Sequence, residues 1–581
     1  MAVPLKAPKE VDHCRHLLQG LAKNLVDRLY GPDGPPWGTP FSALEDAALL
    51  LAQSLRKAFL DLALSRQADA FLLSPPAPLC LCPACGRDTL PKDPQPRFLF
   101  ARAATLEWHE PRRHCGKCRK AFFPQSMSLG IDPGRYSTSL LDLVCYAGAN
   151  KSSFREASVD LDKFSDLVVH EKQVERLCKR IGSERLAQRD EQVARFLALP
   201  LVQRCASVPE GVTPPTAGQV AVVMADAGML QLREEDQDEA AANANVSSCD
   251  LAALATDAHE SGATDAKAEE DHDQDEKPSG RYWHEDKVGL TLLMQSEESQ
   301  TDPCANIPDT FIDAQRVAKI VRGLKKAKAL QAAEEDQSGE EDPDPDEQQE
   351  PEETPYQGPS LQKRQVVASR QSWPLFGALL ASAAYLAGFA KAPRKAFVAD
   401  GARAIWGVWK ARFSSYTPIL DFIHAMSYVY ESAKAMGQEE GTGWKLYATW
   451  ITWVWQGKVS QVIEALQQWQ QVNGKPQKGE AKTSTRSVVA KALGYLVSNQ
   501  KRMKYDEYRK KGLPIVSSLV ESMVKQVSRR VKGTEKFWGE EGAEAILQLR
   551  ADYLSDGDVM AGFWQRRQAA ATGQRSYRPR S

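Results

Sequence analysis

Three carboxylate residues in this sequence stand at the ends of apolar runs or at the start of a helical pattern. Asp226 follows the apolar run at 220–225, and Asp400 follows a second run at 396–399. Runs of this kind predict buried strands, whose carboxyl ends are where open α/β sheets place their functional groups. Glu521 lies just inside a helical pattern that follows a loop. The sequence therefore offers two strand-end aspartates and one helical glutamate for a common site.

Carboxylates that converge in this way favour a site for two divalent metal ions. Mg²⁺ and Mn²⁺ prefer oxygen ligands, and a pair of such ions stabilises the attacking and leaving oxygens of a phosphoryl transfer. A further apolar run ends at Asp421, and His424 follows it by one helical turn. His424 is open to two interpretations, a contact to a DNA strand near the site or a buried histidine with satisfied hydrogen bonds.

Four cysteines occur as two C-x-x-C pairs, Cys82 with Cys85 and Cys115 with Cys118. This spacing predicts four thiolates around a structural Zn²⁺, with no coordination position left open for catalysis. The segment between the two pairs has the pattern of two strands, which is typical of a zinc ribbon. Cys80 and His114 flank the pairs and are left outside the predicted ligand set.

A helical pattern at 171–182 separates an apolar stripe from a basic face. The basic face consists of Lys172, Arg176, Lys179 and Arg180. Such a helix suits the major groove of DNA, and it equally suits an ordinary solvated surface, so charge alone favours neither. The preceding helix is expected to begin with a capping box, because Glu156 follows Ser153 by three residues.

The order of several short motifs resembles that of DDE transposases of bacterial insertion sequences, in the Kra-type group related to Mutator-like elements. The motifs extend over most of the chain between about residues 80 and 565. They are 153–157, 398–402 with Ile405 and Trp406, 420–424, 499–505, 512–515, 520–522, and 532–533 with Phe537 and Trp538.

This resemblance implies a ribonuclease H-like core, a mixed five-stranded sheet flanked by helices and interrupted by a helical insertion domain. It implies that Asp226, Asp400 and Glu521 are the catalytic residues and bind Mg²⁺ or Mn²⁺, so that the enzyme cleaves DNA and transfers the freed strand. The expected partners are double-stranded DNA at the transposon ends, target DNA and further copies of the chain. Basic residues on the helix after Glu521 would contact the DNA, namely Lys525, Arg529 and Arg530, and His424 would join them.

Two local features depart from the family pattern. Asp226 is followed by Ala-Gly-Met, where the family tends to have Gly and a basic or polar residue, and Ser517-Ser518 replaces a Gly-containing turn. Because all three carboxylates are present, the sequence favours an active enzyme. The alternatives are a catalytically silent captured transposase that acts as a DNA-binding protein, and a structure-specific nuclease.

The predicted domain organisation follows these motifs. Two acidic segments, 234–278 and 331–357, are expected to be disordered insertions in the core, because their composition cannot bury enough apolar surface. They are either solvated loops or phosphate mimics that restrain basic surfaces. The predicted domains are a helical lead-in at 1–75, a zinc ribbon at 76–125, a helix-turn-helix-like DNA-binding region at 135–200, the first part of the core at 218–410, a helical insertion domain at 411–511, the final core helix at 512–565 and a basic disordered tail at 566–581.

Bulk properties restrict the class of protein. The 581 residues carry a formal net charge of −2, which hides the contrast between acidic insertions and basic helices. Eleven cysteines without a secretory signal favour a reducing, cytoplasmic compartment. The apolar stretch 374–390 is expected to be a buried core helix, so no membrane partner is predicted.

A cluster of tryptophans is interpreted as core packing, with one of them as a candidate for stacking on an unpaired base. The cluster consists of Trp444, Trp450, Trp453 and Trp455, with Trp469 further on.

Overall fold

The computed structural model describes residues 8–102, 104–233, 281–333, 358–437, 439, 441–533 and 536–575. The acidic insertions expected at 234–278 and 331–357 lie outside this part of the chain, except for residues 331–333, which end a helix. The chain divides into two compact units. One unit comprises residues 1–140 with 566–581, and the other comprises residues 141–565.

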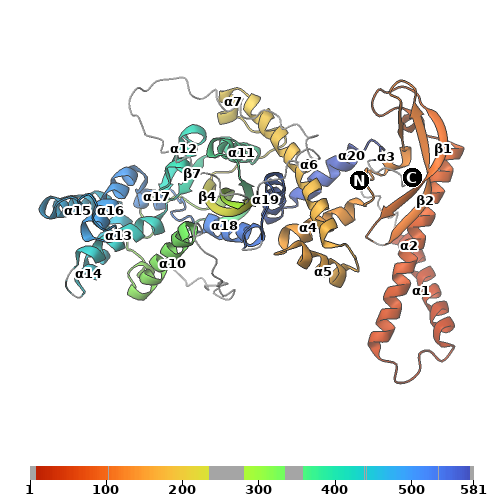
Figure 1. The fold of residues 1–581 in the computed structure, drawn as a ribbon, viewed down its shortest axis with the longest axis horizontal. Coiled ribbons are helices and arrows are strands. Elements are labelled where there is room, and N and C mark those ends of the chain that lie inside the picture. Colours follow the sequence, from red (N-terminus) through yellow and green to blue (C-terminus); the bar gives the residue numbers. More distant parts are fainter. Residues whose placement is uncertain are drawn as a thin grey trace. The chain divides into compact units, whose positions relative to one another are not determined.

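The first unit combines two long helices with a small antiparallel sheet. Helices α1 (Pro8–Tyr30) and α2 (Phe41–Leu73) form a hairpin, drawn in red and orange in Figure 1. Strands β1 (Leu90–Phe100), β2 (Thr105–Cys115) and β3 (Lys120–Phe122) follow, in the order β1-β2-β3, and α3 (Pro124–Ser128) closes the segment. The turn η1 (Ala77–Cys80) precedes the sheet. The strand pair predicted between the two C-x-x-C sequences is confirmed.

The small core of this unit lies between α2 and the sheet. Ala68 of α2 packs with Leu99, Leu106 and Trp108 of the two long strands. Gln125 joins the layers, because its amide donates to the carbonyl of Leu64 and accepts from the indole N–H of Trp108. The helical lead-in and the cysteine-bearing strands are therefore one folded unit.

The basic tail expected to be disordered is folded onto this unit as far as residue 575. Arg567 pairs with the buried Asp132, and Arg575 pairs with the buried Glu110 at 2.7 Å. The guanidinium of Arg575 also stacks on the ring of Phe123. The prediction of disorder is wrong for residues 566–575, because two buried carboxylates elsewhere in the sequence require cationic partners. Residues 576–581 lie outside the described residues.

The second unit begins with four helices. These are α4 (Thr138–Asn150, which spans the division between units), α5 (Phe154–Ser165), α6 (Glu171–Ala198) and α7 (Leu201–Ala206). The capping box at the start of α5 is confirmed in its first half, because the hydroxyl of Ser153 accepts from the backbone N–H of Glu156. Helix α6 is longer than predicted. Its buried Arg185 forms an ion pair with Asp552 in α19 (Glu540–Leu554).

A mixed five-stranded sheet forms the centre of the second unit. Its strands are β4 (Gln219–Arg233), β5 (Arg281–Gln295), β6 (Ser360–Ser369), β7 (Arg394–Ala399) and β8 (Thr417–Leu420). The spatial order is β6-β5-β4-β7-β8, with β4–β5 and β5–β6 antiparallel and β4–β7 and β7–β8 parallel. The predicted mixed α/β architecture is confirmed at this level. The boundary expected at residue 411 is wrong, because β8 still belongs to the sheet.

Helices cover both faces of this sheet. On one face lies α11 (Trp373–Leu386), whose Phe376 and Leu380 approach Gly289 of β5. On the other lies α18 (Ser518–Val531), whose Val524 approaches Gly228 of β4. Successive residues of a strand point to opposite faces, so Asp226 and Gly228 share the α18 face. Helix α11, the predicted core helix, is buried over most of its length. Among the described residues, no helix is both long and apolar enough to cross a membrane.

The remaining helices belong wholly or mainly to the second unit, and α13, α14, α15 and α16 lie together at one end of it in Figure 1. They are α10 (Ala314–Ala333), α12 (Arg403–Arg412), α13 (Phe422–Met436), α14 (Thr442–Trp455), α15 (Val459–Asn473), α16 (Thr485–Asn499), α17 (Tyr505–Lys510) and α20 (Val559–Ala569), with η3 (Asp309–Phe311), η4 (Phe389–Lys391) and η5 (Gln500–Arg502). Trp450 and Trp455 are buried, and the indole of Trp455 donates to the carbonyl of Cys304. These two tryptophans are core residues.

Candidate metal centres

Asp400 and Asp421 follow two adjacent parallel strands. Asp400 comes directly after β7, and Asp421 comes directly after β8, where it is the N-cap residue of α13. The two strand ends are level, because Ala399 pairs with Leu420 and the backbone N–H of Asp421 donates to the carbonyl of Ala399 at 2.8 Å. Parallel strands therefore deliver both aspartates to the same edge of the sheet.

Asp226 lies in the middle of β4 and not at a strand end as predicted. Strand β4 continues to Arg233, because it stays paired with β5 as far as Arg281. The register with β7 nevertheless pairs Met224 with Val398, which sets Asp226 level with Asp400 on the neighbouring strand. Burial, followed by the charge of Asp400, raises the pKa of Asp226 to about 7, and the charge of Glu521 adds to this effect. The negative charges of Asp400 and Glu521 thus both disfavour the ionised form of Asp226.

Glu521 is positioned by the loop that leads into α18. The hydroxyl of Ser517 donates to Oε1 of Glu521 at 3.2 Å, and the backbone N–H of Ser517 donates to the carboxylate of Asp421. The carbonyl of Ile515 accepts from the backbone N–H of Phe422 at 2.9 Å. Ser517 is the N-cap residue of α18, but its side chain bonds to Glu521 and not to a backbone N–H. Serine at this position therefore orients the carboxylate.

Asp421 and His424 form a buried ion pair beside Glu521. Nδ1 of His424 lies 3.2 Å from Oδ1 of Asp421 and 3.8 Å from Oε1 of Glu521. Burial opposes the charged imidazole, but the hydrogen bond to Asp421 and the surrounding carboxylates outweigh it and raise the pKa of His424 to about 9. Burial would also raise the pKa of Asp421, yet its hydrogen bonds to His424 and Ser517 hold it below the usual value.

Ligand atoms of Asp421, His424 and Glu521 all lie within 4.8 Å of one another, a spacing that could hold a metal ion. Asp421 was not among the predicted ligands, although its place at a strand end, three residues before a histidine, was visible in the sequence. Its oxygens already accept from His424 and Ser517. Asp421 therefore positions the neighbouring groups. Among the described residues, Asp226 and Asp400 are not part of this closely spaced group, and of the predicted three carboxylates it contains Glu521.

Two tyrosines line the approach to Asp400, and neither was predicted. The rings of Tyr428 and Tyr495 stack with centroids 3.8 Å apart. A Cβ added at Gly401 would lie 2.2 Å from Cε2 of Tyr495, so only glycine fits beside this ring. Burial and then the charge of Asp400 raise the pKa of Tyr495 well above its usual value. The glycine that follows Asp400 was the sequence signal for a close contact at this point. The residue that makes the contact, Tyr495, is 94 residues further along the chain, so the sequence alone does not identify it.

The basic residues predicted to contact DNA differ in exposure. Lys525 and Arg529 are exposed on α18, as expected, but Arg530 is only 2% exposed. Its Nε donates to the carbonyl of Gly148, and its guanidinium lies 4.4 Å from the ring centroid of Phe154. The prediction for Arg530 is therefore wrong, because the apolar face of α18 carries this residue into the core.

The basic face predicted on α6 is only partly free. Lys172 and Arg176 are exposed, whereas Lys179 and Arg180 are half-buried. Lys179 forms an ion pair with Glu175 at 2.9 Å, and its stem lies against Gly542 of α19. Lys179 and Arg180 are thus engaged within the fold.

The four predicted cysteine ligands converge in the first unit. Sγ of Cys82 lies 3.9 Å from Sγ of Cys118, and Sγ of Cys85 lies 3.6 Å from Sγ of Cys115. All four thiols form one group that could hold a metal ion, and Cys80 and His114 are not part of it. A hydrogen bond from the backbone of Cys118 is the main cause that lowers the pKa of Cys115 to about 7. Tetrahedral bonds of ~2.3 Å place sulfurs ~3.8 Å apart, so these separations suit a Zn²⁺-sized ion.

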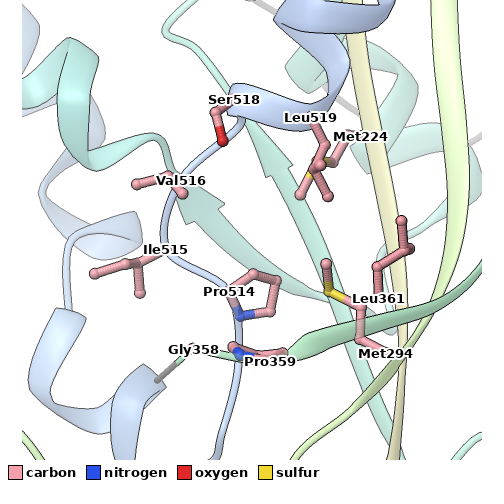
Figure 2. A pocket seen from close by; sticks show the side chains of 10 residues that line it. All are labelled: Met224, Met294, Gly358, Pro359, Leu361, Pro514, Ile515, Val516, Ser518 and Leu519. Carbon is pink, nitrogen blue, oxygen red and sulfur yellow. The ribbon is translucent and has the colours of Figure 1, made fainter. Parts of the chain in front are cut away.

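An apolar cavity of about 340 Å³ lies under the loop that leads into α18. Figure 2 shows Met294 and Leu361 on the sheet side and Pro514 and Ile515 on the loop side. Its only side-chain oxygen belongs to Ser518. None of the described residues that line the cavity is charged, so none of the predicted carboxylates faces it.

The chain matches no protein-family model, and no curated protein is significantly similar to it.

Proposed function

We propose that this chain is a DDE transposase, which binds the ends of an insertion sequence and catalyses metal-dependent cleavage and strand transfer of phosphodiesters. One observation carries the proposal. Asp226 and Asp400 stand level on neighbouring parallel strands, and Glu521 enters from α18 closely enough for its charge to raise the pKa of Asp226. These three residues come from distant parts of the sequence and supply the carboxylates of the proposed site.

The sheet topology supports a ribonuclease H-like core. In chain order, the first three strands are antiparallel neighbours, and the fourth and fifth lie beyond the first strand and parallel to it. This resembles the arrangement expected of DDE enzymes, in which the first and fourth strands each carry a catalytic aspartate. Asp226 lies in the first of those two strands, and Asp400 directly follows the other.

The donor set suits two Mg²⁺ or Mn²⁺ ions held by Asp226, Asp400 and Glu521. Burial and then the charge of Asp400 raise the pKa of Asp226 to about 7, and divalent cations would favour the charged carboxylates. Bound ions of this kind lower the pKa of an attacking hydroxyl and stabilise the leaving oxygen. The protein's own contribution is orientation, because Ser517 and the Asp421–His424 pair hold Glu521 in place.

Exposed basic residues near the site are candidates for phosphate contacts. Lys525 and Arg529 lie one and two helical turns after Glu521 on α18. On α6, Lys172 and Arg176 have the exposure that a contact to double-stranded DNA needs. Transposon ends and target DNA are the proposed partners.

In the first unit, we assign Cys82, Cys85, Cys115 and Cys118 to a structural Zn²⁺ in a zinc ribbon. The cysteines lie before β1, at the end of β2 and in the turn before β3. A metal there would fix the ends of three strands, and four thiolates would leave no site for substrate.

The test is cleavage and joining of DNA that carries the element's ends, with Mg²⁺ or Mn²⁺. Asp400→Ala and Glu521→Ala should each abolish the products, whereas Glu464→Ala, at an exposed acid of α15, should leave them unchanged. End-specific binding by wild type without any product would indicate a captured, silent transposase. Cleavage that depends on DNA shape and shows no preference for ends would indicate a structure-specific nuclease.

A further inference from the structure

The α1–α2 hairpin exposes an unusual amount of apolar surface. Among the hairpin's side chains between residues 15 and 62, eleven large apolar ones are between 42% and 76% exposed. They are Leu17, Leu18, Leu21, Val26, Leu29, Phe41, Leu49, Leu50, Leu55, Phe59 and Leu62. Single exposed apolar residues are normal, but a continuous set of this size marks an interaction surface.

Within its own unit, the second half of α2 is the part that packs against the sheet. Leu60, Leu64 and Ala68 pack against β1 and β2, while the first half of α2 projects beyond the sheet together with α1 (Figure 1). Consecutive residues such as Leu49 and Leu50 lie on different sides of α2, and both are exposed. A helix that is apolar on several sides requires more than one neighbour.

The charges of α2 are arranged symmetrically about Leu51. Glu45 and Asp46 lie six and five residues before it, and Arg56 and Lys57 lie five and six residues after it. All four charged side chains are exposed. If two copies of α2 packed antiparallel about an axis at Leu51, each acidic pair would meet the basic pair of the other copy.

The apolar residues obey the same symmetry. Leu44 would face Ala58, and Ala47 would face Leu55, so that each large side chain meets a small one. Such alternation lets helices approach and interdigitate. We propose that the hairpin is a homodimer interface, in which α1 and α2 of two copies form a four-helix bundle with a two-fold axis near Leu51.

The available area is sufficient for a stable dimer. Eleven side chains that are about half exposed offer on the order of 900 Å² of apolar surface, and a standard interface buries ~800 Å² per partner. An isologous pairing of this kind closes on itself, so it limits assembly to a dimer.

Charge exchange tests the interface in the full-length chain. One variant carries Glu45→Lys and Asp46→Lys, and the other carries Arg56→Glu and Lys57→Glu. Each variant alone would place like charges opposite each other, whereas a mixture restores every opposite-charge contact. Because all four residues are exposed, folding should be preserved; the exposed Lys57–Asp61 ion pair that is lost contributes little. The control is Arg66→Glu with Asp69→Lys, whose two-fold-related positions fall outside α2.

Molar mass by sedimentation equilibrium decides between the outcomes. We expect a dimer for wild type and control, at least a tenfold weaker dimer for each charge variant alone, and a heterodimer of near wild-type affinity for the mixture. A monomeric wild type would overturn the proposal, as would charge variants that dimerise normally. A mixture that fails to associate would overturn the pairing about Leu51. The measurement does not depend on DNA cleavage, so its outcome is separate from that of the proposed function.

Discussion

Nδ1 of His424 lies 3.2 Å from Oδ1 of Asp421, and the backbone N–H of His424 donates to the same oxygen at 2.8 Å. Asp421 therefore caps α13, and its negative charge also stabilises the protonated imidazole. Both groups are buried, with Asp421 fully enclosed and His424 8% exposed. The pair has a direct consequence for the pH dependence of stability, because it raises the pKa of His424 to about 9.

Asp421→Asn should remove this charge interaction and keep much of the helix cap. A histidine with a raised pKa contributes stability below its unfolded pKa of ~6.5, and that contribution is lost as pH rises through about 9. The free energy of unfolding should therefore fall by about 3 kcal/mol at pH ~6 and by much less above pH ~9.5. Chemical denaturation without added Mg²⁺ at both pH values measures this difference. An equal loss of unfolding free energy at both pH values would show that Asp421 contributes to stability only as the helix cap.

Binding of Mg²⁺ should strengthen as pH rises through about 7. The pKa of Asp226 is raised to about 7, first by burial and then by Asp400, so that below this pH a bound proton must be displaced by the ion. The increase in Tm on adding Mg²⁺ should be larger at pH ~8 than at pH ~6, where the affinity is about tenfold lower. Asp226→Asn should abolish this pH dependence. A Tm increase that is independent of pH would argue against Asp226 as a ligand.

Local pattern was sufficient to predict two central strands and the cysteine site. The apolar runs at 220–225 and 396–399 lie within β4 and β7, because such runs have few alternatives to a buried strand. The C-x-x-C pairs likewise specify their own geometry. For these elements, the information lies within a few consecutive residues.

Features that depend on distant partners could not be predicted. Arg530 looked like a surface cation, but its position on α18 directs it onto Phe154, which is nearly 400 residues earlier. Lys179 is covered by α19, and Arg575 is held by Glu110. Periodicity identifies the faces of a helix, but it does not identify which element covers each face. The mid-strand position of Asp226 has the same origin, since pairing with β5 extends β4 beyond its apolar run.

Gly401→Ala should displace Tyr495 and with it the backbone of Asp400. The added Cβ would lie 2.2 Å from a ring carbon, and overpacking of this kind costs about 1–3 kcal/mol. Gly407→Ala is the matched control, because nothing lies within 4 Å of its added Cβ and it stands inside α12, where alanine is favoured over glycine. Thermal unfolding should show a lower Tm for the first variant and an equal or higher Tm for the second. Equal changes in Tm for the two variants would mean that Tyr495 moves aside without any loss of stability.

Cys115→Ser should release the metal proposed for the first unit. The thiol of Cys115 lies 3.6 Å from that of Cys85, and losing one of four thiolates leaves a coordination position open to water and weakens the binding of a tetrahedral ion. Metal analysis should find one Zn²⁺ per chain in wild type and less than a tenth of that in the variant. Limited proteolysis should then cut near the ends of β2 and β3. Cys80→Ser, adjacent to the site but outside the ligand group, should keep both the metal and the resistance to protease.

Asp286 carries a buried carboxylate, and its replacement should change how the stability of the protein depends on pH. The side chain is fully buried opposite Gly228, and within the described part of the chain neither of its oxygens accepts a hydrogen bond. Burial raises the pKa of Asp286 to about 6, although Lys287 and Lys532 oppose the shift.

An aspartate with a raised pKa binds an extra proton in the folded state between pH ~4 and ~6, so the free energy of unfolding decreases as pH rises across this window. Asp286→Asn does not titrate and escapes this loss. Its stability relative to wild type should therefore improve by about 3 kcal/mol between pH ~4 and ~7, whatever the amide itself costs. Urea unfolding of both proteins at the two pH values gives this difference directly. A constant difference would mean that Asp286 keeps its ordinary pKa, and hence that a cation or water satisfies the carboxylate within the fold.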